Sequence, residues 1–176
     1  MLWSILGLRK FRWSFTHTFL EGTKTFDCNN DMINTFVKKS LKKRVRKHLS
    51  QAYVLLDTQN SDEFVGFYTL DTFSITRDSF EDIDKPSGLP PVVPVVKLGM
   101  LGVSKHLQGQ GIGKRVLRDA MLKTVQISDL AGCRGIYLLA EKDAILFYSS
   151  LGFVALKSSE PVPMFLDIEV IVDLVV

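Results

Sequence analysis

The sequence predicts one α/β domain in which helices pack against a single mixed sheet, and three observations support this fold class. The chain has 176 residues, enough to bury roughly 70% of its unfolded surface around one core. Apolar patterns of helical and strand period alternate along it. Its only cysteines, Cys28 and Cys133, lie far apart without metal-ligand spacing, so neither disulfides nor a metal site is expected and a reducing cytoplasm fits best.

The first recognisable element is a helix within residues 26–49. Asp and Asn residues at its start can cap a helix, and apolar side chains then recur at helical spacing. These side chains are Ile33, Phe36, Val37, Leu41 and Val45. The outer face is basic, because seven of the ten residues from Lys38 to Lys47 are Lys or Arg and none is acidic. Such a face fits a polyanion, and a solvated helix face stays open as the alternative.

Two β-rich segments and a loop come next. Residues 52–58 (AYVLLDT) and 63–75 (EFVGFYTLDTFSI) are rich in β-branched and aromatic side chains and are separated by a turn-prone QNSDE, so they predict a hairpin. Residues 78–94 are acidic first and then punctuated by prolines, which predicts a surface loop. The apolar run VVKLGMLGV at residues 95–103 is typical of a central strand.

A glycine-rich segment, LQGQGIGKRVL at residues 107–117, leads from this strand into the next helix. Such a segment presents unpaired backbone N–H groups at the positive end of a helix dipole, which favours a phosphate. It departs from the dinucleotide fingerprint, which needs glycine where Lys114 stands. It departs from the nucleoside-triphosphate loop, which needs glycine at Gln108 and Ser or Thr at Arg115. An ordinary strand-to-helix turn stays open as the alternative.

The segment after the glycine loop predicts a helix, a strand and a short helix. The first helix begins at Ile112, carries one apolar stripe and ends near Gly132. GIYLLA at residues 135–140 predicts a buried strand. KDAILFYSSLGF at residues 142–153 predicts a short helix closed by Gly152.

The two ends of the chain are less regular. Apolar and acidic side chains largely alternate in residues 164–176, which predicts a half-buried strand. Residues 1–24 show no distinctive pattern, and their charges follow the short apolar run at the start rather than precede it. No stretch reaches the length of about 18 apolar residues that a membrane span needs. We therefore expect an unexported protein without a membrane partner.

The order of these motifs resembles the GNAT N-acetyltransferase superfamily. The resemblance rests on the strand LGMLGV, the Gln108-x-x-Gly111-x-Gly113 loop, a long helix, the strand IYLLA and the helix containing FYSSLGF. Within this superfamily the chain is most similar to bacterial toxins that acetylate the amino group of aminoacyl-tRNA, from about Phe26 onward. The resemblance implies a GNAT acyltransferase fold, with a mixed and mostly antiparallel sheet, as one domain over residues 1–176.

The resemblance also implies a cofactor and the residues that hold it. Acetyl-coenzyme A (acetyl-CoA) would lie against the end of the central strand, and the glycine loop would receive its pyrophosphate on backbone N–H groups. The implied cofactor-binding residues are Leu101, Gly102, Val103, Gln108, Gly109, Gln110, Gly111, Ile112, Gly113, Lys114 and Arg115, with Lys105 assisting at the phosphates. Tyr148 in FYSSLGF would be the catalytic acid beside the leaving sulfur, and no metal is expected.

No general base stands out in the sequence. Glu63, Asp71 and Glu141 are candidates by residue type alone. A base is dispensable for some amines, because an α-amino group has a pKa near 8 whereas that of lysine is about 10.4. This difference favours an α-amine substrate over a lysine side chain.

If the substrate is aminoacyl-tRNA, the basic segment would neutralise its phosphates. The residues concerned are Lys38, Lys39, Lys42, Lys43, Arg44, Arg46 and Lys47. By the same resemblance the chain would be the toxin of a toxin–antitoxin pair and would halt translation in the cytoplasm. A ribbon-helix-helix antitoxin would neutralise it, operator DNA would be reached only through the complex with that antitoxin, and the toxin would be a homodimer.

Two other functions stay open from the sequence. The same fold and cofactor could acetylate a protein N-terminus, a lysine or a small amine. A catalytically idle acyltransferase fold could instead serve as a nucleic-acid-binding or regulatory module. The intact glycine loop and Tyr148 argue against this last function.

Overall fold

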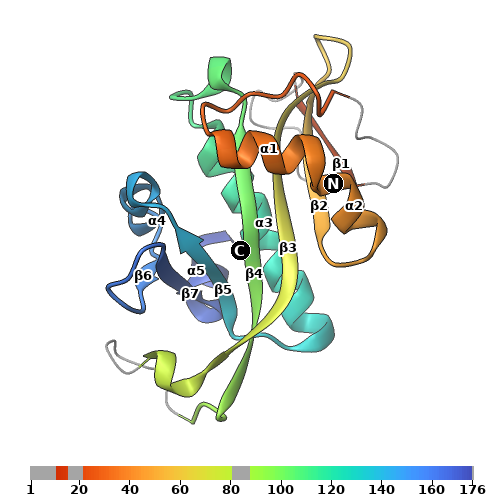
Figure 1. Ribbon diagram of the computed structural model, residues 1–176. Coiled ribbons are helices and arrows are strands. Elements are labelled where there is room, and N and C mark those ends of the chain that lie inside the picture. The colour runs from red at the N-terminus through yellow and green to blue at the C-terminus, as the bar shows by residue number, and fades with distance from the viewer. Residues whose placement is uncertain (1–10, 16–21, 81–87, 176) are drawn as a thin grey trace. The chain divides into compact units, whose positions relative to one another are not determined.

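A computed structural model describes residues 11–15, 22–80 and 88–175 and shows, within them, a sheet of seven strands in the order β1-β2-β3-β4-β5-β7-β6 (Figure 1). The strands are β1 (Phe11–Phe15), β2 (Gln51–Asp57), β3 (Glu63–Thr76), β4 (Val92–Val103), β5 (Gly135–Ala140), β6 (Val154–Ala155) and β7 (Val162–Asp167). Strands β4 and β5 pair in parallel, while β1 with β2, β5 with β7 and β6 with β7 pair antiparallel. The predicted mixed, mostly antiparallel sheet is confirmed.

Helices precede, connect and follow these strands. They are α1 (Asp31–Lys39), α2 (Leu41–Arg46), α3 (Ile112–Ala131), α4 (Ile145–Ser149) and α5 (Ile168–Val175), with 3₁₀ turns η1 (Arg77–Phe80), η2 (Lys105–Leu107) and η3 (Lys142–Ala144). The predicted hairpin strands, central strand, long helix, buried strand and short helix are all present. In the part of the chain that is described, no helix has the length and apolar character needed to cross a membrane.

The chain forms two compact units. The first comprises Met1–Thr69 and Met100–Leu117, and the second comprises Leu70–Gly99 and Arg118–Val176. Strands β3 and β4 and helix α3 each contribute residues to both units.

The core of the first unit is shared by α1, α2, β2 and β3. Phe26 meets the rings of Phe64 and Phe67 edge to face, at centroid distances of 5.1 and 5.6 Å. Other fully or almost fully buried members are Val37, Leu41, Val45, Ala52, Val54 and Leu56. Each large apolar side chain buried in this way contributes about 1.5–3 kcal/mol to folding. This core therefore holds the two basic helices against the sheet.

The single basic helix predicted from residues 26–49 is wrong in one respect, because the structure divides it at Ser40. Helix α1 is capped at its N-terminus by Asn30, whose side-chain oxygen accepts the N–H of Ile33 at 3.0 Å. At Ser40 the φ angle widens to −117°. Val37, Leu41 and Val45 lie four residues apart, and such steps drift around a straight helix of 3.6 residues per turn. The bend at Ser40 lets all three stay buried.

Strand β1 was not expected from the sequence. It pairs with β2 in a register that places Trp13 opposite Leu55. Trp13 meets the buried ring of Tyr68 edge to face at 5.7 Å. Of residues 1–24, positions 1–10 and 16–21 lie outside the described residues. Positions 81–87 of the predicted surface loop also lie outside them.

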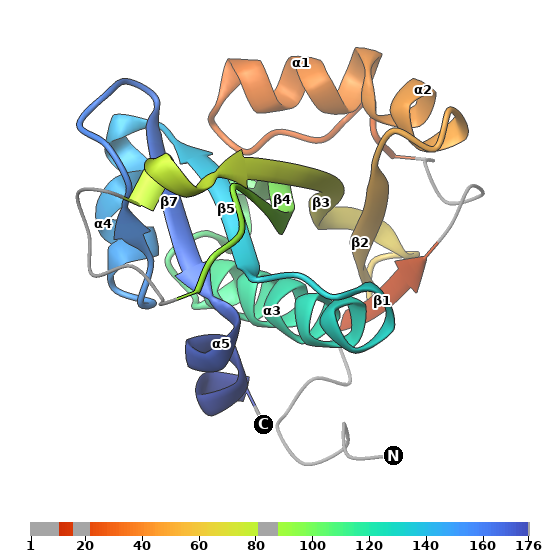
Figure 2. The same ribbon diagram turned by 90° about the horizontal axis from the view of Figure 1, so that it is seen from below.

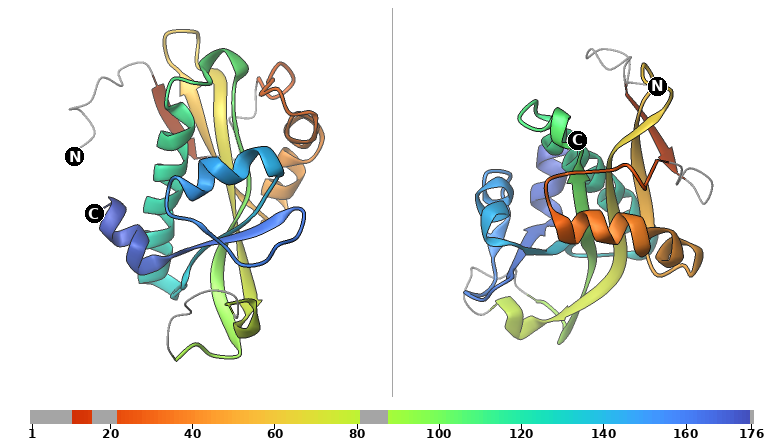
Figure 3. Two further views of the ribbon diagram at one scale, coloured as in Figure 1. Left: turned by 90° about the vertical axis from the view of Figure 1, so that its left-hand side faces the viewer. Right: turned by 45° about the horizontal axis from the view of Figure 1, so that its top comes forward.

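The second unit is built around β5, whose side chains Ile136, Leu138 and Ala140 are buried in alternation. Strand β5 pairs with β7 over its whole length, and α5 contacts both strands (Figure 2). Phe80 of η1 meets Phe165 of β7 edge to face at 5.0 Å. The segment from α4 through β6 to β7 is seen in blue in Figure 3.

The prediction that residues 164–176 form a strand is wrong beyond Asp167, where the chain turns into α5. The carboxylate of Asp167 accepts the N–H of Glu169 at 2.9 Å and so starts the helix. Ile171 and Val175 are buried one helical turn apart. At the other end, the guanidinium of Arg118 donates to the backbone oxygens of Leu174 and Val175 at 3.1 and 3.2 Å. These bonds satisfy carbonyls that a helix end leaves unpaired.

Candidate functional site

The glycine loop lies in the first unit, between η2 and α3. Gly109 and Gly111 have φ angles of +73° and +76°, in the left-handed region that glycine tolerates best. A Cβ atom added to either residue would meet no atom within 4 Å. The backbone of the loop is therefore open, and a ligand can approach it without meeting side chains of the loop.

The first turn of α3 adds the chemistry of an anion site. The first N–H groups of a helix have no partner within the helix and lie at the positive end of its dipole. Helix α3 is 20 residues long and has no acidic residue in its first turn. Lys114 and Arg115 are exposed there. The open loop, the free amides and these two cations fit a pyrophosphate group such as that of acetyl-CoA.

The end of β4 supplies backbone groups for an extended ligand. Strand β4 pairs with β5 at Val96, opposite Ile136, and at Lys97, opposite Tyr137. Leu98 and Gly99 continue β4 beyond these pairs, although β5 itself continues and pairs with β7. The β4 backbone beyond Lys97 thus keeps hydrogen-bonding groups that the β5 ladder does not use. An amide-containing arm such as pantetheine fits such an edge.

Gly102, near the end of β4, is also required by packing. A Cβ atom there would lie 3.0 Å from the ring of Phe67 and 3.2 Å from Ile33 and Phe26. The next residues are fixed to β3, because the N–H of Ser104 donates to the oxygen of Val65 at 2.8 Å. The chain therefore enters the glycine loop from a rigid position.

A hydrogen-bond network that the sequence did not reveal braces the glycine loop against the segment before α1. Gln108 donates through Nε2 to the backbone oxygens of Cys28, 2.8 Å away, and Val103, 3.0 Å away. The Lys105 N–H donates to the oxygen of Asp27 at 2.9 Å, and the Lys105 ammonium pairs with the Asp27 carboxylate at 2.9 Å. The side chains of Gln108 and Lys105, expected at the cofactor, thus hold the loop in place.

Asp27 and Asn34 form the centre of this network. The Asp27 carboxylate accepts the N–H of Asn29 and the side-chain amide of Asn34, each at 2.9 Å. These bonds, with that from Lys105, hold the pKa of Asp27 well below its usual range. The stabilisation is present above the ordinary carboxyl pKa and is lost only as the pH falls towards the lowered one. The network therefore persists at neutral pH.

Replacing Asn34 with leucine is expected to lower the free energy of unfolding by about 1–3 kcal/mol. Asn34 is buried, and its Oδ1 accepts the N–H of Cys28 at 2.9 Å. Leucine has a similar volume but leaves this buried N–H without an acceptor. Urea denaturation followed by circular dichroism measures the loss. Thr35→Leu, at the exposed neighbouring position, is the control and should change stability by less than about 0.5 kcal/mol; equal losses in the two variants would contradict the role of Asn34.

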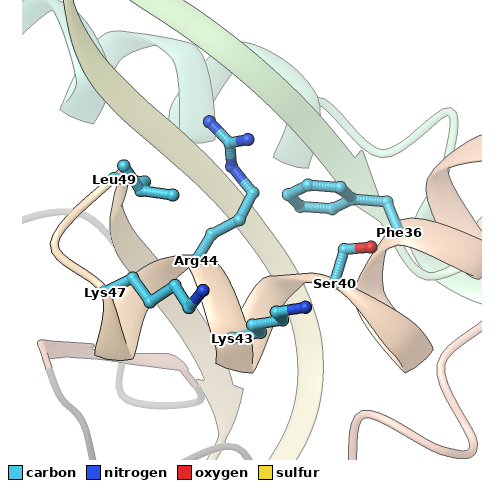
Figure 4. Close-up of a pocket in the computed structure, with 6 residues that line it drawn as sticks. All are labelled: Phe36, Ser40, Lys43, Arg44, Lys47 and Leu49. Atoms are coloured by element: carbon cyan, nitrogen blue, oxygen red, sulfur yellow. The ribbon is translucent and has the colours of Figure 1, made fainter.

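The predicted basic residues lie on α1, on α2 and at the end of α2, all in the first unit. Lys38 and Lys39 occupy the last turn of α1, Lys42, Lys43, Arg44 and Arg46 lie on α2, and Lys47 follows it. All are exposed except Arg44, which is half-buried. Three of them, Lys43, Arg44 and Lys47, line a groove of about 310 Å³ together with Phe36, Ser40 and Leu49 (Figure 4). Three of the seven predicted basic residues thus line the groove, and the other four lie outside its described lining.

Tyr148 lies on α4 in the second unit. Its ring meets Phe147 at 5.1 Å and Phe153 at 5.5 Å, both edge to face. Its backbone oxygen accepts the N–H groups of Leu151 and Phe153 at 3.0 and 3.2 Å, so the turn closed by Gly152 fixes its position. Burial raises the pKa of Tyr148 to about 12. The phenol is therefore fully protonated at physiological pH and can donate a hydrogen bond.

The carboxylates considered as general bases are scattered. Glu63 is exposed at the start of β3, Asp71 is half-buried within β3, and Glu141 is exposed before η3. His48 and His106 are exposed. Among the residues with a described position, no group of three or more His, Cys, Asp and Glu side chains could hold a metal ion.

Comparison with known proteins places these features in a wider group. Residues 49–155 match the acetyltransferase (GNAT) domain family. A tRNA-acetylating toxin of Mycobacterium tuberculosis (strain ATCC 25618 / H37Rv) is 32% identical over 117 residues, which are 64% of this chain and 68% of that protein.

Solved structures are similar over almost the whole chain. The crystal structure of a bacterial toxin is 34% identical, with a TM-score of 0.87 over 93% of this chain and 94% of the other. AtaT complexed with acetyl-methionyl-tRNAfMet is 26% identical, with a TM-score of 0.83 over 93% and 98% of the two chains. A tyrosine-to-phenylalanine mutant of AtaT, bound to the C-terminus of the antitoxin AtaR and acetyl-CoA, is 25% identical, with a TM-score of 0.80 over 94% and 98%.

Proposed function

The chain belongs to the GNAT acetyltransferase family, and we propose that it transfers the acetyl group of acetyl-CoA to the α-amino group of aminoacyl-tRNA, inhibiting translation as the toxin of a toxin–antitoxin pair. The observation that carries the proposal is the open backbone at Gly109 and Gly111 before α3, in a chain that is 32% identical over 117 residues to a tRNA-acetylating toxin. We further propose that the two units act as one acetyltransferase domain over residues 1–176, since β3, β4 and α3 contribute to both.

The cofactor site is proposed on the loop and the strand that precedes it. Acetyl-CoA supplies a thioester whose carbonyl carbon an amine can attack. The N–H groups from Gly109 to Lys114 would bind its pyrophosphate, with the cations of Lys114 and Arg115 close by. Backbone groups from Leu101 to Val103 would pair with the pantetheine arm, and an N–H there would polarise the thioester carbonyl.

Tyr148 is proposed as the catalytic acid. In acetyl transfer a carbon–nitrogen bond would replace the carbon–sulfur bond, the electron pair would pass to the sulfur, and the surplus proton of the amine would pass to water. A thiol has a pKa near 8.5 in water, so its anion is a moderate leaving group that a hydrogen bond stabilises. The Tyr148 hydroxyl, with a pKa of about 12, always carries the proton needed for this bond. This supports its role near the departing thiolate.

The amine itself needs little help from the protein. With a pKa of about 7.7–8.0, roughly a quarter to two-fifths of an α-amino group is neutral at pH 7.5, against about 0.1% of a lysine side chain with a pKa of about 10.4. Glu63, Asp71 and Glu141 are spread over different parts of the chain, which is consistent with a reaction that takes its amine already neutral from solution.

The partners follow from the proposed substrate. The seven basic residues between Lys38 and Lys47 would contact tRNA phosphates. Relatives are found with tRNA and with an antitoxin, and we propose that this chain has both kinds of partner. We propose in addition that the antitoxin is of the ribbon-helix-helix type, that operator DNA is bound through its complex with the toxin, and that the toxin is a homodimer acting in the cytoplasm, where charged tRNA and acetyl-CoA are found.

A direct assay tests the proposal. Purified protein is incubated with labelled acetyl-CoA and a pool of charged tRNAs, and the released aminoacyl-adenosines are analysed by mass spectrometry. Acetylated aminoacyl species would support the proposal and identify the amino acid. Acetylation of peptides, lysine or small amines in place of charged tRNA would establish the alternative acetyltransferase. Absence of acetyl-CoA binding in calorimetry would point instead to a catalytically idle module.

The basic helices should make tRNA binding sensitive to salt. Replacing both Lys39 and Lys42 with glutamine is expected to make the tRNA affinity less sensitive to salt. The negative slope of log K for tRNA binding against log salt concentration should become shallower by roughly 1.5 to 2, because two phosphate contacts are lost. Anisotropy titrations of labelled tRNA between 50 and 200 mM salt measure this slope. The pair Lys142→Gln and Lys157→Gln removes the same charge from the second unit, and an equal change of slope there would argue against a specific role of α1 and α2.

A further inference from the structure

The groove between α1 and α2 combines two kinds of surface. Phe36 comes from α1, Lys43 and Arg44 from α2, and Lys47 and Leu49 from the turn that follows. Figure 4 shows the Arg44 side chain rising between Leu49 and the ring of Phe36, while Lys43 and Lys47 lie along the helix beside it. Cations and apolar carbon thus share one hollow.

The charge of the groove favours an anionic ligand. None of the described residues that line it is acidic, and the sequence has no acidic residue between Asp31 and Asp57. Lys43 and Lys47 are four residues apart, a spacing at which like charges on a helix repel each other. Neither makes an ion pair with any described residue. A bound phosphate would relieve this repulsion.

The apolar residues require more than a phosphate. Phe36 is half-buried, and its ring stacks against Phe67 at 6.4 Å with an interplanar angle of 13°. Leu49 is 56% exposed at the edge of the groove. Bases inside a duplex are already stacked on each other, so a duplex offers this surface only its backbone. An unpaired base, in contrast, stacks on aromatic side chains and covers apolar surface.

Arg44 is held in an orientation that suits a flat ligand. Its Nε donates to the Oγ of Ser50 at 2.9 Å, and Ser50 is buried. This bond restrains the guanidinium plane at the groove. Planar guanidinium groups stack on bases as aromatic rings do. The volume of about 310 Å³ lies at the lower end of small-ligand sites, which fits one nucleotide rather than several.

We propose that this groove binds a single unpaired nucleotide of RNA, with its phosphate on Lys43 and Lys47 and its base against Phe36, Arg44 and Leu49. That the RNA is tRNA rests on the proposed function. In that case the groove binds an unpaired nucleotide of the tRNA, and Arg44 contacts its base instead of a phosphate. Lys38, Lys39, Lys42 and Arg46 remain for the phosphates of paired regions. The basic helices would then select single-stranded elements in addition to attracting negative charge.

The test uses the full chain and two RNA probes without an amino acid. One probe is a six-nucleotide single strand containing 2-aminopurine, whose fluorescence falls on stacking, and the other is a blunt duplex of the same length. The wild type is expected to bind the single strand more tightly and to quench it. Phe36→Leu should weaken single-strand binding by about tenfold and abolish the quenching, whereas Phe36→Tyr should retain both.

Further variants keep the outcome independent of folding. Leu49→Ser changes an exposed side chain and should weaken binding of the single strand more than that of the duplex. Lys38→Gln, outside the groove, should weaken both probes alike. Tighter binding of the duplex, or unchanged quenching in Phe36→Leu and Leu49→Ser, would overturn the proposal. So would an acidic peptide of equal charge that binds as tightly as the single strand. A wild type that binds and quenches the probe but acetylates no charged tRNA would refute the proposed function alone.

Discussion

Replacing Tyr148 with phenylalanine is expected to lower kcat for acetyl transfer by about 10²- to 10⁴-fold, with little change in the binding of acetyl-CoA. The substitution removes only the hydroxyl proposed to stabilise the leaving thiolate. The ring keeps its edge-to-face contacts with Phe147 and Phe153, so the fold of the turn should persist. Steady-state kinetics of acetylation of charged tRNA measure kcat, and calorimetry measures the affinity for acetyl-CoA.

Tyr137→Phe is the matched control for this prediction. Tyr137 lies on β5 in the same unit as Tyr148, stacks on Phe73 at 5.3 Å and likewise has a pKa raised by burial. Its substitution removes a similar hydroxyl and should leave kcat within about twofold. A Tyr148→Phe variant as active as this control would show that the leaving thiolate needs no stabilisation by the Tyr148 hydroxyl.

The pH dependence of the wild type gives a second test of the same role. Since Tyr148 has a pKa of about 12, its hydroxyl keeps most of its protons up to about pH 11. The rate should therefore rise as the substrate amine loses its proton near pH 8 and should show no decline caused by Tyr148 below pH 11. Unfolded tyrosine ionises near pH 10, so the folded state loses stability as the pH rises from about 10 to 12. Tyr148→Phe should lack this part of the loss.

Replacing Gly111 with alanine is expected to raise the Kd for acetyl-CoA by about ten- to a hundredfold. Gly111 has a φ of +76°, and a Cβ there strains the backbone by about 1–2 kcal/mol. This strain favours other conformations of the loop over the native one, so the N–H groups that would bond the pyrophosphate are misplaced. Each such bond to a charged group is worth about 1.5–3 kcal/mol. Calorimetry measures the affinity.

Gly132→Ala separates this effect from general strain. Gly132 follows α3 with a φ of +66° and, like Gly111, would meet nothing within 4 Å of an added Cβ. Both variants should lose about 1–2 kcal/mol of stability, but only Gly111→Ala should bind acetyl-CoA more weakly. If the two variants had equal affinities, the loop would be an ordinary strand-to-helix turn and the cofactor site would lie elsewhere.

Local patterns predicted most elements and the chemistry of the glycine loop. Apolar runs predicted β4 and β5, and the stripe from Ile112 together with Gly132 predicted α3. These elements are readable because each buries a contiguous or periodic face against the core, so its period is present in its own residues. The open glycines at positions 109 and 111 are readable for a similar reason, since only a local backbone requirement selects them.

The bracing of the site could not be predicted in this way. Gln108 and Cys28 are 80 positions apart, and Asp27 and Lys105 are 78 apart. No period connects such residues, and polar side chains in a loop look alike whether they face a ligand or another loop. The groove could not be predicted for the same reason. In the sequence Phe36 and Leu49 look like ordinary apolar positions, and only the arrangement of α1, α2 and the following turn places them beside three cations.

The C-terminal segment shows where the sequence stops determining the structure. By itself the sequence determined that residues 168–175 would bury part of an apolar face, and both a strand and a helix can do so with these residues. Contacts in the tertiary structure stabilise the helix α5 over a strand for these residues. Arg118, 56 positions before Leu174, caps the carbonyls of the helix, and Arg134 holds Asp167 at its start at 2.9 Å. Such distant partners decide between conformations because a short segment gains too little from its own hydrogen bonds to choose one alone.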